Sequence, residues 1–318
     1  MGKLCASRTA IVTGAGGGLG KCYAKALAEA GANVVVNDIN PKTAGATVRE
    51  IIEYGGSASP DHSDITDHVE AGKIFGHALE KYGDVNVVVN NAGVCRDRMF
   101  ASLNPEEWDM VMAVHLKGHY CLASHAAKYW RQQSKDGATV SARIINTSSG
   151  AGLLGSVGQS NYSAAKGGIL SLTLVQAAEL QRYGVTVNAL APQARTGMTE
   201  DVFADMMKIP EDGSFDRFNP ENVAPLVWSG WRAKRPRALR GNVSKFLAAN
   251  FLLPKAGTAD QKLIRNRSGR LMSLVMLSLI CWLNESQLNP YTAVRKLRCL
   301  YQKRHYRIRR LMSKVTIF

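Results

Sequence analysis

The sequence of 318 residues has no apolar run long enough to cross a bilayer. Its longest run, Leu271–Leu283, has thirteen residues, whereas a membrane-spanning helix needs about 20. Because arginines precede this run, it could lie along a membrane interface or form a buried helix. The sequence therefore predicts no membrane-spanning helix.

Cysteine is also scarce. Six cysteines are scattered along the chain without the spacing of a metal site. This distribution argues against a disulfide framework and favours a reducing compartment. The amino terminus leads directly into the first expected strand, which leaves no room for a signal peptide. We therefore expect a cytoplasmic protein without a bound metal.

Acidic residues are almost absent from the last ninety positions. Residues 229–318 hold 20 Lys and Arg but only two acids, Asp260 and Glu285, for a net charge of +18. Residues 1–228 have a net charge of −3. A basic segment of this kind can bind nucleic acid or an anionic surface, although it contains no recognised nucleic-acid motif. The break in charge divides the chain into a first domain, residues 1–228, and a basic tail, residues 229–318.

Short apolar runs alternate with helical patterns through the first domain. The runs are Arg8–Gly14, Asn33–Ile39, Val85–Gly93, Arg143–Ser149 and Val185–Pro192. This alternation predicts a Rossmann-type α/β fold with a doubly wound parallel sheet. Ligand-binding loops in such a sheet gather at the carboxyl ends of the strands. The sequence places at that edge Gly14–Gly20, Asp38, Asp64, Asn91, Ser149 and Pro192.

The first apolar run leads into a glycine-rich turn and then a helical pattern. Strand, glycine turn and helix form the context that a dinucleotide-binding fingerprint requires. Gly14 permits the tight turn, Gly18 allows the backbone to approach a pyrophosphate, and Gly20 allows close packing of helix and strand. Leu19 lies within the same turn. The alternative is an ordinary flexible turn.

An acidic residue follows the second apolar run. Asp38 lies eighteen residues after Gly20, where a carboxylate can accept hydrogen bonds from the adenosine ribose hydroxyls. Because it would repel a 2′-phosphate, it favours NAD over NADP. The alternative is that Asp38 only caps the helix expected after Pro41.

A tyrosine and a lysine lie four residues apart in the last long helical pattern. Tyr162 and Lys166 would share one face of that helix, so the ammonium could lower the pKa of the phenol. Ser149 lies thirteen residues before Tyr162, where its hydroxyl could point at a substrate oxygen. On its own, such a pair is more often an ordinary surface contact.

Together these motifs resemble those of the short-chain dehydrogenase/reductase family. Thr13–Gly20 matches the family motif TGxxxGxG, Asn90–Gly93 matches NNAG, and Ser149, Tyr162 and Lys166 have the family's catalytic spacing. The chain is most similar to the (3R)-hydroxyacyl-CoA dehydrogenase part of peroxisomal multifunctional enzymes and to its bacterial relatives. The resemblance ends near residue 228.

The resemblance implies a role for each motif residue. Tyr162 would be the general base in alcohol oxidation, Lys166 would lower its pKa and bind the nicotinamide ribose, and Ser149 would hold the reacting oxygen. The resemblance also implies a set of cofactor contacts, which comprises Asp64, Ile65, Asn91, Ala92, Gly93 and Pro192.

Two positions depart from the family pattern. His115 replaces the usual catalytic asparagine, so it could relay protons or could be a satisfied histidine of the helix. Pro192 is followed by Gln193 where the family has glycine. This change alters the loop expected to cover the nicotinamide.

The ending also departs from the family. Asn219–Trp228 resembles the start of the penultimate helix, but the expected last strand with its Gly-Gly signature does not follow, and Pro236 opposes a continued helix. A frame-shifted ending is favoured, with a basic binding extension and membrane association as alternatives. We expect the normal last strand to be lacking, and a homo-oligomer only if the ending were normal.

These observations predict an NAD-dependent enzyme that interconverts a secondary alcohol and a ketone. The resemblance suggests a 3-hydroxyacyl thioester as its small-molecule substrate and lipid metabolism as its setting. The alternative is a non-catalytic or destabilised dinucleotide-binding protein whose basic tail mediates interaction with nucleic acid or an anionic surface.

Overall fold

A parallel sheet of six strands organises the first domain. The computed structural model describes residues 4–197 and 207–229. The strands are ordered β3-β2-β1-β4-β5-β6, and all neighbours are parallel. Their bounds are β1 Thr9–Thr13, β2 Asn33–Asn37, β3 Ser57–Asp61, β4 Val87–Asn90, β5 Ala142–Thr147 and β6 Val185–Leu190. The predicted doubly wound sheet is confirmed.

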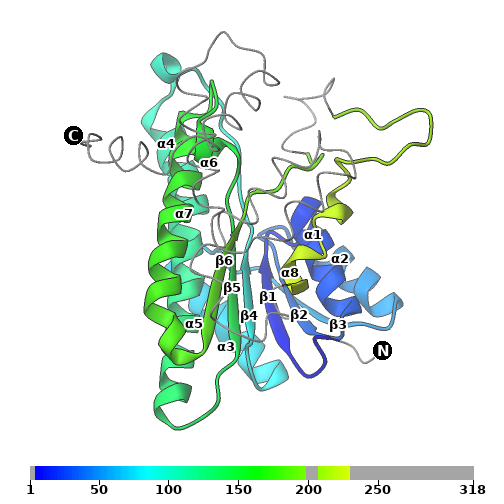
Figure 1. Cartoon of the computed structure of the whole chain (residues 1–318), viewed down its shortest axis with the longest axis vertical. Helices are drawn as coiled ribbons and strands as arrows, with labels where there is room; N and C mark the ends of the chain where they lie inside the picture. Colours follow the sequence, from blue (N-terminus) through cyan, green and yellow to red (C-terminus); the bar gives the residue numbers. More distant parts are fainter. Residues whose placement is uncertain (1–3, 198–206, 230–318) are drawn as a thin grey trace, which may run out of the picture. The chain divides into compact units, whose positions relative to one another are not determined.

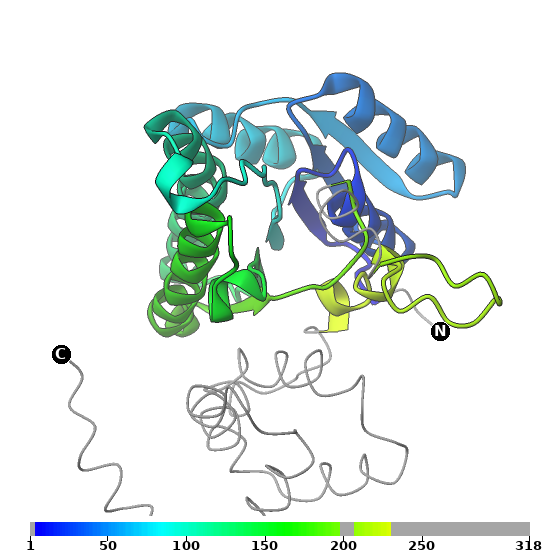
Figure 2. The same cartoon turned by 90° about the horizontal axis from the view of Figure 1, so that it is seen from above.

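Helices cover both faces of the sheet (Figures 1 and 2). One layer contains α3 (His68–Tyr82), α5 (Gly118–Lys135) and α7 (Ser160–Leu180), and the other contains α1 (Gly18–Glu29), α2 (Pro41–Glu53) and α8 (Leu226–Ser229). Shorter elements complete the described part, namely η1 (Phe100–Ser102), α4 (Pro105–Met112), η2 (Ala113–Lys117), α6 (Ala151–Leu154), η3 (Gln181–Tyr183) and η4 (Pro220–Asn222).

The strands are apolar on both sides because each face of the sheet has its own core. Ile11, Val35, Val88 and Ile144 belong to the core beneath α3 and α5. Their neighbours in sequence, which include Val12, Val34, Val36 and Val89, belong to the core beneath α1 and α2. Successive side chains of a strand point to opposite faces, so the continuous apolar runs in the sequence correspond to strands that are buried twice.

Local signals explain where several helices begin. Asn40 caps α2 through its side chain, Asp67 caps α3, and Asn104 and Glu107 form a reciprocal capping box at α4. These side chains accept the N–H groups that the first turn leaves unpaired. Asp38 is therefore not the cap of α2, so the alternative interpretation of this residue is wrong.

Strand β3 is the one strand of the described sheet that the apolar pattern did not reveal. Its sequence, SASPD, is polar and contains Pro60. β3 lies at the edge of the sheet, where a proline removes no hydrogen bond needed by a further strand. Edge position, rather than burial, therefore accounts for this strand.

The sheet order reverses between β1 and β4. From β1 the chain proceeds outward through β2 to β3, and it then returns to β4 on the other side of β1. In doubly wound sheets the ligand crevice lies at the carboxyl edge beside such a switch point. Among the described residues, the glycine turn and the NNAG turn flank that crevice.

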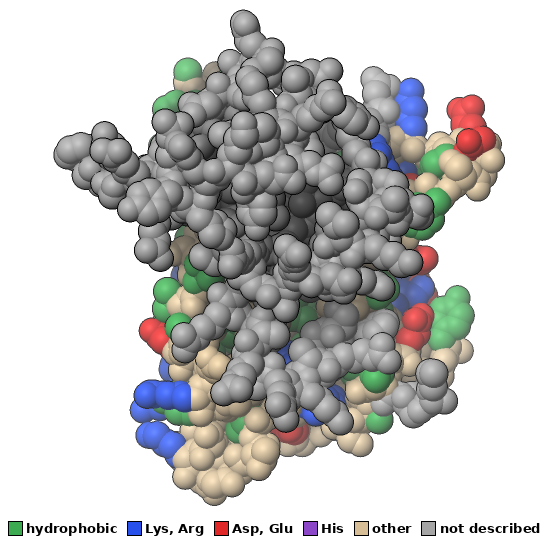
Figure 3. Space-filling view, viewed as in Figure 1, with side chains coloured by type: hydrophobic (Ala, Val, Ile, Leu, Met, Phe, Trp, Pro, Cys, Tyr) green, Lys and Arg blue, Asp and Glu red, His purple; other side chains and the backbone are tan. Residues whose placement is uncertain are grey.

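Predictions about the end of the chain lie largely outside the described residues. η4 and α8 occupy the region expected to begin the penultimate helix, but the missing last strand and the basic tail both fall beyond residue 229. In the part that the structure describes, no helix is both long and apolar enough to cross a membrane. On the coloured surface in Figure 3, basic and acidic side chains are interspersed.

Candidate active site

The glycine turn between β1 and α1 has no room for a side chain at Gly14 or Gly20. A Cβ on Gly14, whose φ is +61°, would lie 2.7 Å from the Ala92 Cα. A Cβ on Gly20 would lie 2.1 Å from the Gly14 carbonyl oxygen. Gly18 also has a positive φ, of +50°. The turn therefore requires glycine at each of the three predicted positions.

The start of α1 suits an anionic group. No side chain caps this helix, and its first turn contains no acidic residue. Its free N–H groups and helix dipole favour a phosphate. The glycine cradle and the uncapped helix together fit the pyrophosphate of a dinucleotide, as the sequence predicts.

Thr13 joins the glycine turn to the NNAG turn. Its hydroxyl accepts the backbone N–H groups of Asn91 and Ala92 at 3.0 and 3.1 Å. The Asn91 amide in turn donates to the Thr13 carbonyl at 3.1 Å. The Asn91 side chain therefore links the two turns. Thr13 is the first residue of the matched TGxxxGxG motif, but its role as a link between the turns was not predicted from sequence.

Asp38 lies at the end of β2 and faces the glycine turn. One carboxylate oxygen accepts the Gly16 N–H at 2.9 Å, and the other accepts the Asn40 N–H at 3.0 Å. The residue remains partly exposed, and each carboxylate oxygen can accept a further hydrogen bond. Asp38 is therefore placed as a ribose-binding carboxylate would be.

Asp64 and Ile65 lie after β3 and differ in environment. Asp64 is partly exposed, and its carboxylate accepts the Thr66 N–H at 2.8 Å. Ile65 is buried in the core beneath α5, and a Cβ on Gly118 would lie 2.6 Å from its Cδ1. Asp64 is thus available at the edge, whereas the Ile65 side chain mainly supports α5.

Ser149, Tyr162 and Lys166 come together on the other side of the crevice. The Ser149 hydroxyl is near enough to the Tyr162 phenol to lower its pKa, and it accepts the Ala151 N–H at 3.2 Å. The Lys166 Nζ lies 5.5 Å from the centroid of the Tyr162 ring and donates to the Thr147 carbonyl at 2.6 Å. The structure thus assembles all three predicted residues at the end of β5 and on α7.

Comparison with known proteins identifies this arrangement. The family model described as short chain dehydrogenase matches residues 8–207. The chain belongs to the short-chain dehydrogenase family. It is therefore an oxidoreductase that acts on hydroxyl groups, in a family that generally uses NAD or NADP.

Several relatives of this short-chain dehydrogenase carry informative names. It is 44% identical over 230 residues to "Hydroxyacyl-CoA dehydrogenase ChsB1" of Mycobacterium tuberculosis, covering 69% of this chain and 71% of the relative. It is 42% identical over 230 residues to "Peroxisomal multifunctional enzyme type 2" of mouse, covering 69% of this chain and 29% of that protein. The chain thus spans less than a third of the mouse protein.

A solved structure gives the same fold. The crystal structure of a short chain dehydrogenase from Mycobacterium avium is 52% identical and superposes with a TM-score of 0.65. The similarity covers 71% of this chain and 78% of that one. Both the family and the fold predicted from the motifs are therefore confirmed.

Burial, rather than the neighbouring lysine, dominates the acid–base properties of this dehydrogenase's site. Burial raises the pKa of Tyr162 to about 12, and the nearby Ser149 hydroxyl offsets only part of this rise. Burial also lowers the pKa of Lys166 to about 7. The predicted lowering of the phenol pKa is wrong for this structure, because loss of hydration disfavours the charged forms of both groups.

His115 is buried in the short π-helix η2, where it contacts Val94 and Tyr162. Its Nε2 lies 2.8 Å from the Val94 carbonyl oxygen and 3.1 Å from the Val94 nitrogen. Its ring meets the Tyr162 ring edge-on, with centroids 5.1 Å apart. A Cβ on Gly93 would lie 2.3 Å from the His115 Cε1, so glycine is required where the ring packs.

The protonation of His115 bears on its predicted role. Burial and the nearby Lys166 lower the pKa of His115 to about 3. The imidazole is therefore neutral over the physiological range. The neutral ring is hydrogen-bonded to Val94 through Nε2 and packs on Tyr162, but its buried Nδ1 has no partner among the described residues. Only one ring nitrogen is therefore satisfied, and a proton-relay role stays a prediction.

The loop after β6 departs from the family pattern but still reaches the glycine turn. Pro192 is partly buried, Gln193 is exposed, and Ala194 belongs to the core beneath α1. The Thr196 Cγ2 lies 3.6 Å from the position a Cβ on Gly18 would take. Thr196 therefore covers the glycine turn, a placement that the sequence analysis did not predict.

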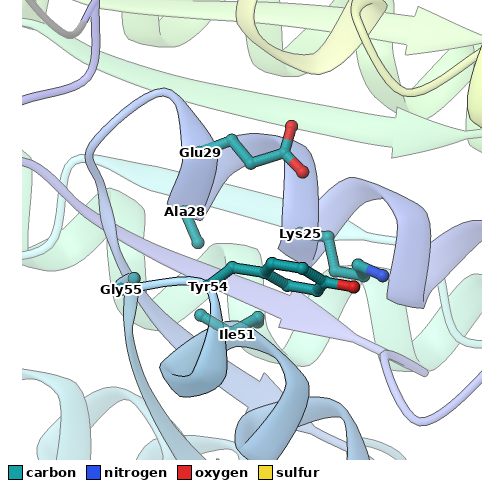
Figure 4. A pocket seen from close by; sticks show the side chains of 7 residues that line it. Lys25, Ala28, Glu29, Ile51, Tyr54 and Gly55 are labelled. Atoms are coloured by element: carbon teal, nitrogen blue, oxygen red, sulfur yellow. The ribbon is translucent and has the colours of Figure 1, made fainter.

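A separate cavity of about 240 Å³ lies at the far end of α1. Figure 4 shows Lys25, Glu29 and Tyr54 around it, with Ile51 beneath the tyrosine ring. The lining residues lie five or more residues beyond Gly20 on α1, or at and just after the end of α2. The cavity is therefore distinct from the crevice.

Proposed function

We propose that this short-chain dehydrogenase uses NAD to interconvert a 3-hydroxyacyl thioester and its 3-oxo form. The observation that carries this proposal is the meeting of Ser149, Tyr162 and Lys166 at the same sheet edge as the glycine turn. Reaction class follows from family membership. The thioester is supported by the resemblance and by the names of relatives such as the hydroxyacyl-CoA dehydrogenase of M. tuberculosis.

In the oxidation direction, each residue acts on one atom of the reacting alcohol. The Ser149 hydroxyl binds the substrate oxygen. Tyr162, which must be in its phenolate form for this step, takes the proton of the alcohol, while the carbon–hydrogen bond breaks with its electron pair. A bound NAD would supply the acceptor for that hydride. Reduction reverses these transfers, with Tyr162 as the proton donor.

Lys166 contributes through its position and its variable charge. Its Nζ donates to the Thr147 carbonyl, so the ammonium is held beside the Tyr162 ring. With a pKa lowered to about 7, it exists as a mixture of charged and neutral forms near neutral pH. Any additional negative charge near Tyr162, including the phenolate itself, favours the charged form.

Asp38 supports NAD as the nucleotide. Its carboxylate accepts the Gly16 N–H of the glycine turn, and a 2′-phosphate bound beside it would be repelled. The lysine that follows the fingerprint does not offset this charge. Lys21 instead pairs with Glu50 at 2.6 Å.

Initial rates with each nucleotide test this assignment. A panel of (3R)-hydroxyacyl-CoA substrates of increasing chain length should produce NADH, and NAD should be preferred over NADP by at least about tenfold in kcat/KM. Asp38→Asn should reduce that preference, whereas Asp61→Asn, which changes a carboxylate that binds Asn37 and Ser63 instead, should not.

The results separate substrate from cofactor. Equal use of NAD and NADP by the unchanged protein would refute the nucleotide assignment. Activity on other secondary alcohols, with none on the thioesters, would refute the substrate class but retain the reaction class.

A further inference from the structure

The loop after β6 is held between the glycine turn and the segment beginning at Met207. On one side, Thr196 covers Gly18. On the other side, the backbone N–H of the preceding residue, Arg195, donates to the Phe218 carbonyl at 2.7 Å. The position of Thr196 over the glycine turn therefore depends on how Arg195 is anchored.

Arg195 is anchored by its side chain as well. Its guanidinium donates to the Met207 carbonyl at 2.6 Å and forms an ion pair with Asp216. The two side chains are only 16% and 19% exposed. Guanidinium–carboxylate pairs that are partly shielded from water and make several hydrogen bonds impose a defined geometry.

Asp216 in turn belongs to a platform that packs on α1. One Asp216 carboxylate oxygen accepts the Phe218 N–H at 3.1 Å, and its backbone carbonyl accepts the Asn222 amide at 2.8 Å. Val223 and Ala224, which follow directly, are buried in the same core as α1. Ala194, on the loop itself, is buried there too.

These contacts form a continuous ring that begins and ends at the glycine turn. α1 begins at the glycine turn and supports the platform; the platform holds Asp216; Asp216 holds Arg195; and Arg195 places Thr196 back over Gly18. Breaking the ion pair leaves the loop attached through its backbone and through the Arg195–Met207 hydrogen bond, but removes the charged contact between the loop and the platform.

We propose that Arg195 and Asp216 are positioning residues that hold Thr196 over the bound dinucleotide. This inference rests on the proposed function only in requiring that the glycine turn bind a nicotinamide dinucleotide. Without the ion pair, binding must also order the loop, and that ordering lowers affinity. Ser149 and Tyr162 lie on other elements, so the chemical step should be largely preserved.

Calorimetric titration of the full-length protein with NADH measures the change in NADH affinity. Asp216→Asn should weaken NADH binding about tenfold, a typical coupling for a contacting charged pair. The KM for NAD should rise similarly, while kcat changes by less than about twofold. The double variant Arg195→Asp with Asp216→Arg should recover part of the affinity. Glu211→Gln, an exposed residue of the same segment, is the matched control and should bind normally.

A second variant guards against loss of folding. Arg195→Lys keeps the positive charge but cannot donate to both Met207 and Asp216 in the fork geometry of arginine, so it should weaken NADH binding about threefold. Unchanged affinity in both Asp216→Asn and Arg195→Lys would overturn the positioning role while leaving the proposed function intact. A fall in kcat with unchanged KM would also overturn it. If the unchanged protein bound no dinucleotide, both the positioning role and the proposed function would fail.

Discussion

The two sides of the crevice differ in the groups that they offer to a ligand. On the side of β1 and β2, the glycine turn exposes backbone, and Gly14 and Gly20 leave no space for a Cβ. On the side of β5 and α7, the site is built from buried polar side chains, including His115, Asn146 and Lys166. On the first side, the lack of space restricts which residues fit. On the second side, loss of hydration changes the pKa values of the buried groups.

Several buried polar atoms have no hydrogen-bond partner within the protein. Among the described residues, these atoms include the Asn90 Oδ1, the His115 Nδ1 and the Thr147 Oγ1, but also the Tyr23 hydroxyl on α1 and the Thr47 Oγ1 on α2. His119, one helical turn after His115, is also buried with no well-formed hydrogen bond from its ring, and burial holds its pKa well below the usual value. Ordered water commonly binds groups of this kind.

The comparison predicts that catalysis is most sensitive on the buried side. Tyr162→Phe should lower kcat/KM by about a thousandfold, because it removes the group that transfers the proton. NADH affinity should change by less than about threefold, since the glycine turn is untouched. NADH absorbance and calorimetric titration measure the two quantities.

Tyr183→Phe provides the matched control for this substitution. The Tyr183 hydroxyl contacts Arg182 at the end of α7, outside the crevice. It should leave kcat/KM unchanged. If Tyr162→Phe retained activity within tenfold of the unchanged protein, the assignment of the general base would be lost.

Stability should be most sensitive on the glycine side. Gly20→Ala places a methyl group 2.1 Å from the Gly14 carbonyl and 2.6 Å from the Asn91 Nδ2. The resulting overpacking should reduce the free energy of unfolding by roughly 3 kcal/mol. Urea denaturation without cofactor measures this effect.

Gly76→Ala is a control with the opposite expected sign. Gly76 lies inside α3 with nothing within 4 Å of its added Cβ, so alanine should stabilise the protein by about 0.5–1 kcal/mol. Equal effects of the two substitutions would contradict the steric explanation.

The desolvation explanation predicts a pH-dependent stability change at Lys166. Its pKa is about 7 in the folded protein and near 10.4 in an unfolded chain. Below pH 7 both states carry the charge, so the full cost of burying it is present; between pH 7 and about 10 the folded lysine is neutral and that cost is progressively relieved. Lys166→Met should therefore stabilise the protein by roughly 2–4 kcal/mol at pH 6 and by much less at pH 10.

Denaturation curves at pH 6, 8 and 10 test whether the stabilisation by Lys166→Met decreases as the pH rises. Lys128→Met, at an exposed position of α5, should show no comparable trend. A stabilisation by Lys166→Met that grew with pH would contradict the lowered pKa.

The smallest expected effects concern helix caps, which should not distinguish the two sides. Asn104→Ala breaks the capping box of α4 and Asn40→Ala removes the cap of α2. Each should reduce the free energy of unfolding by about 1 kcal/mol. Thermal unfolding and NADH titration together measure stability and affinity; a loss of affinity in Asn104→Ala would show that α4 couples to the cofactor side.

Local features of the site were predictable from sequence because they depend on short segments. The tight turn, Asp38 at the end of a strand, and the four-residue spacing of Tyr162 and Lys166 all require only neighbouring residues. Strand β3 was missed because an edge strand of polar residues has no apolar run. Contacts across long separations were also missed, including Thr13 with Asn91 and Arg195 with Asp216.

Five of the six strands, the glycine cradle and the residues at the sheet edge could be predicted from local sequence, because periodicity and turn chemistry are local properties. Which groups lose their water depends instead on tertiary packing. The raised pKa of Tyr162 and the lowered pKa values of Lys166 and His115 follow from packing by elements far apart in the chain. Burial is a collective property of the folded molecule, and it reversed the direction that the spacing of tyrosine and lysine alone predicted.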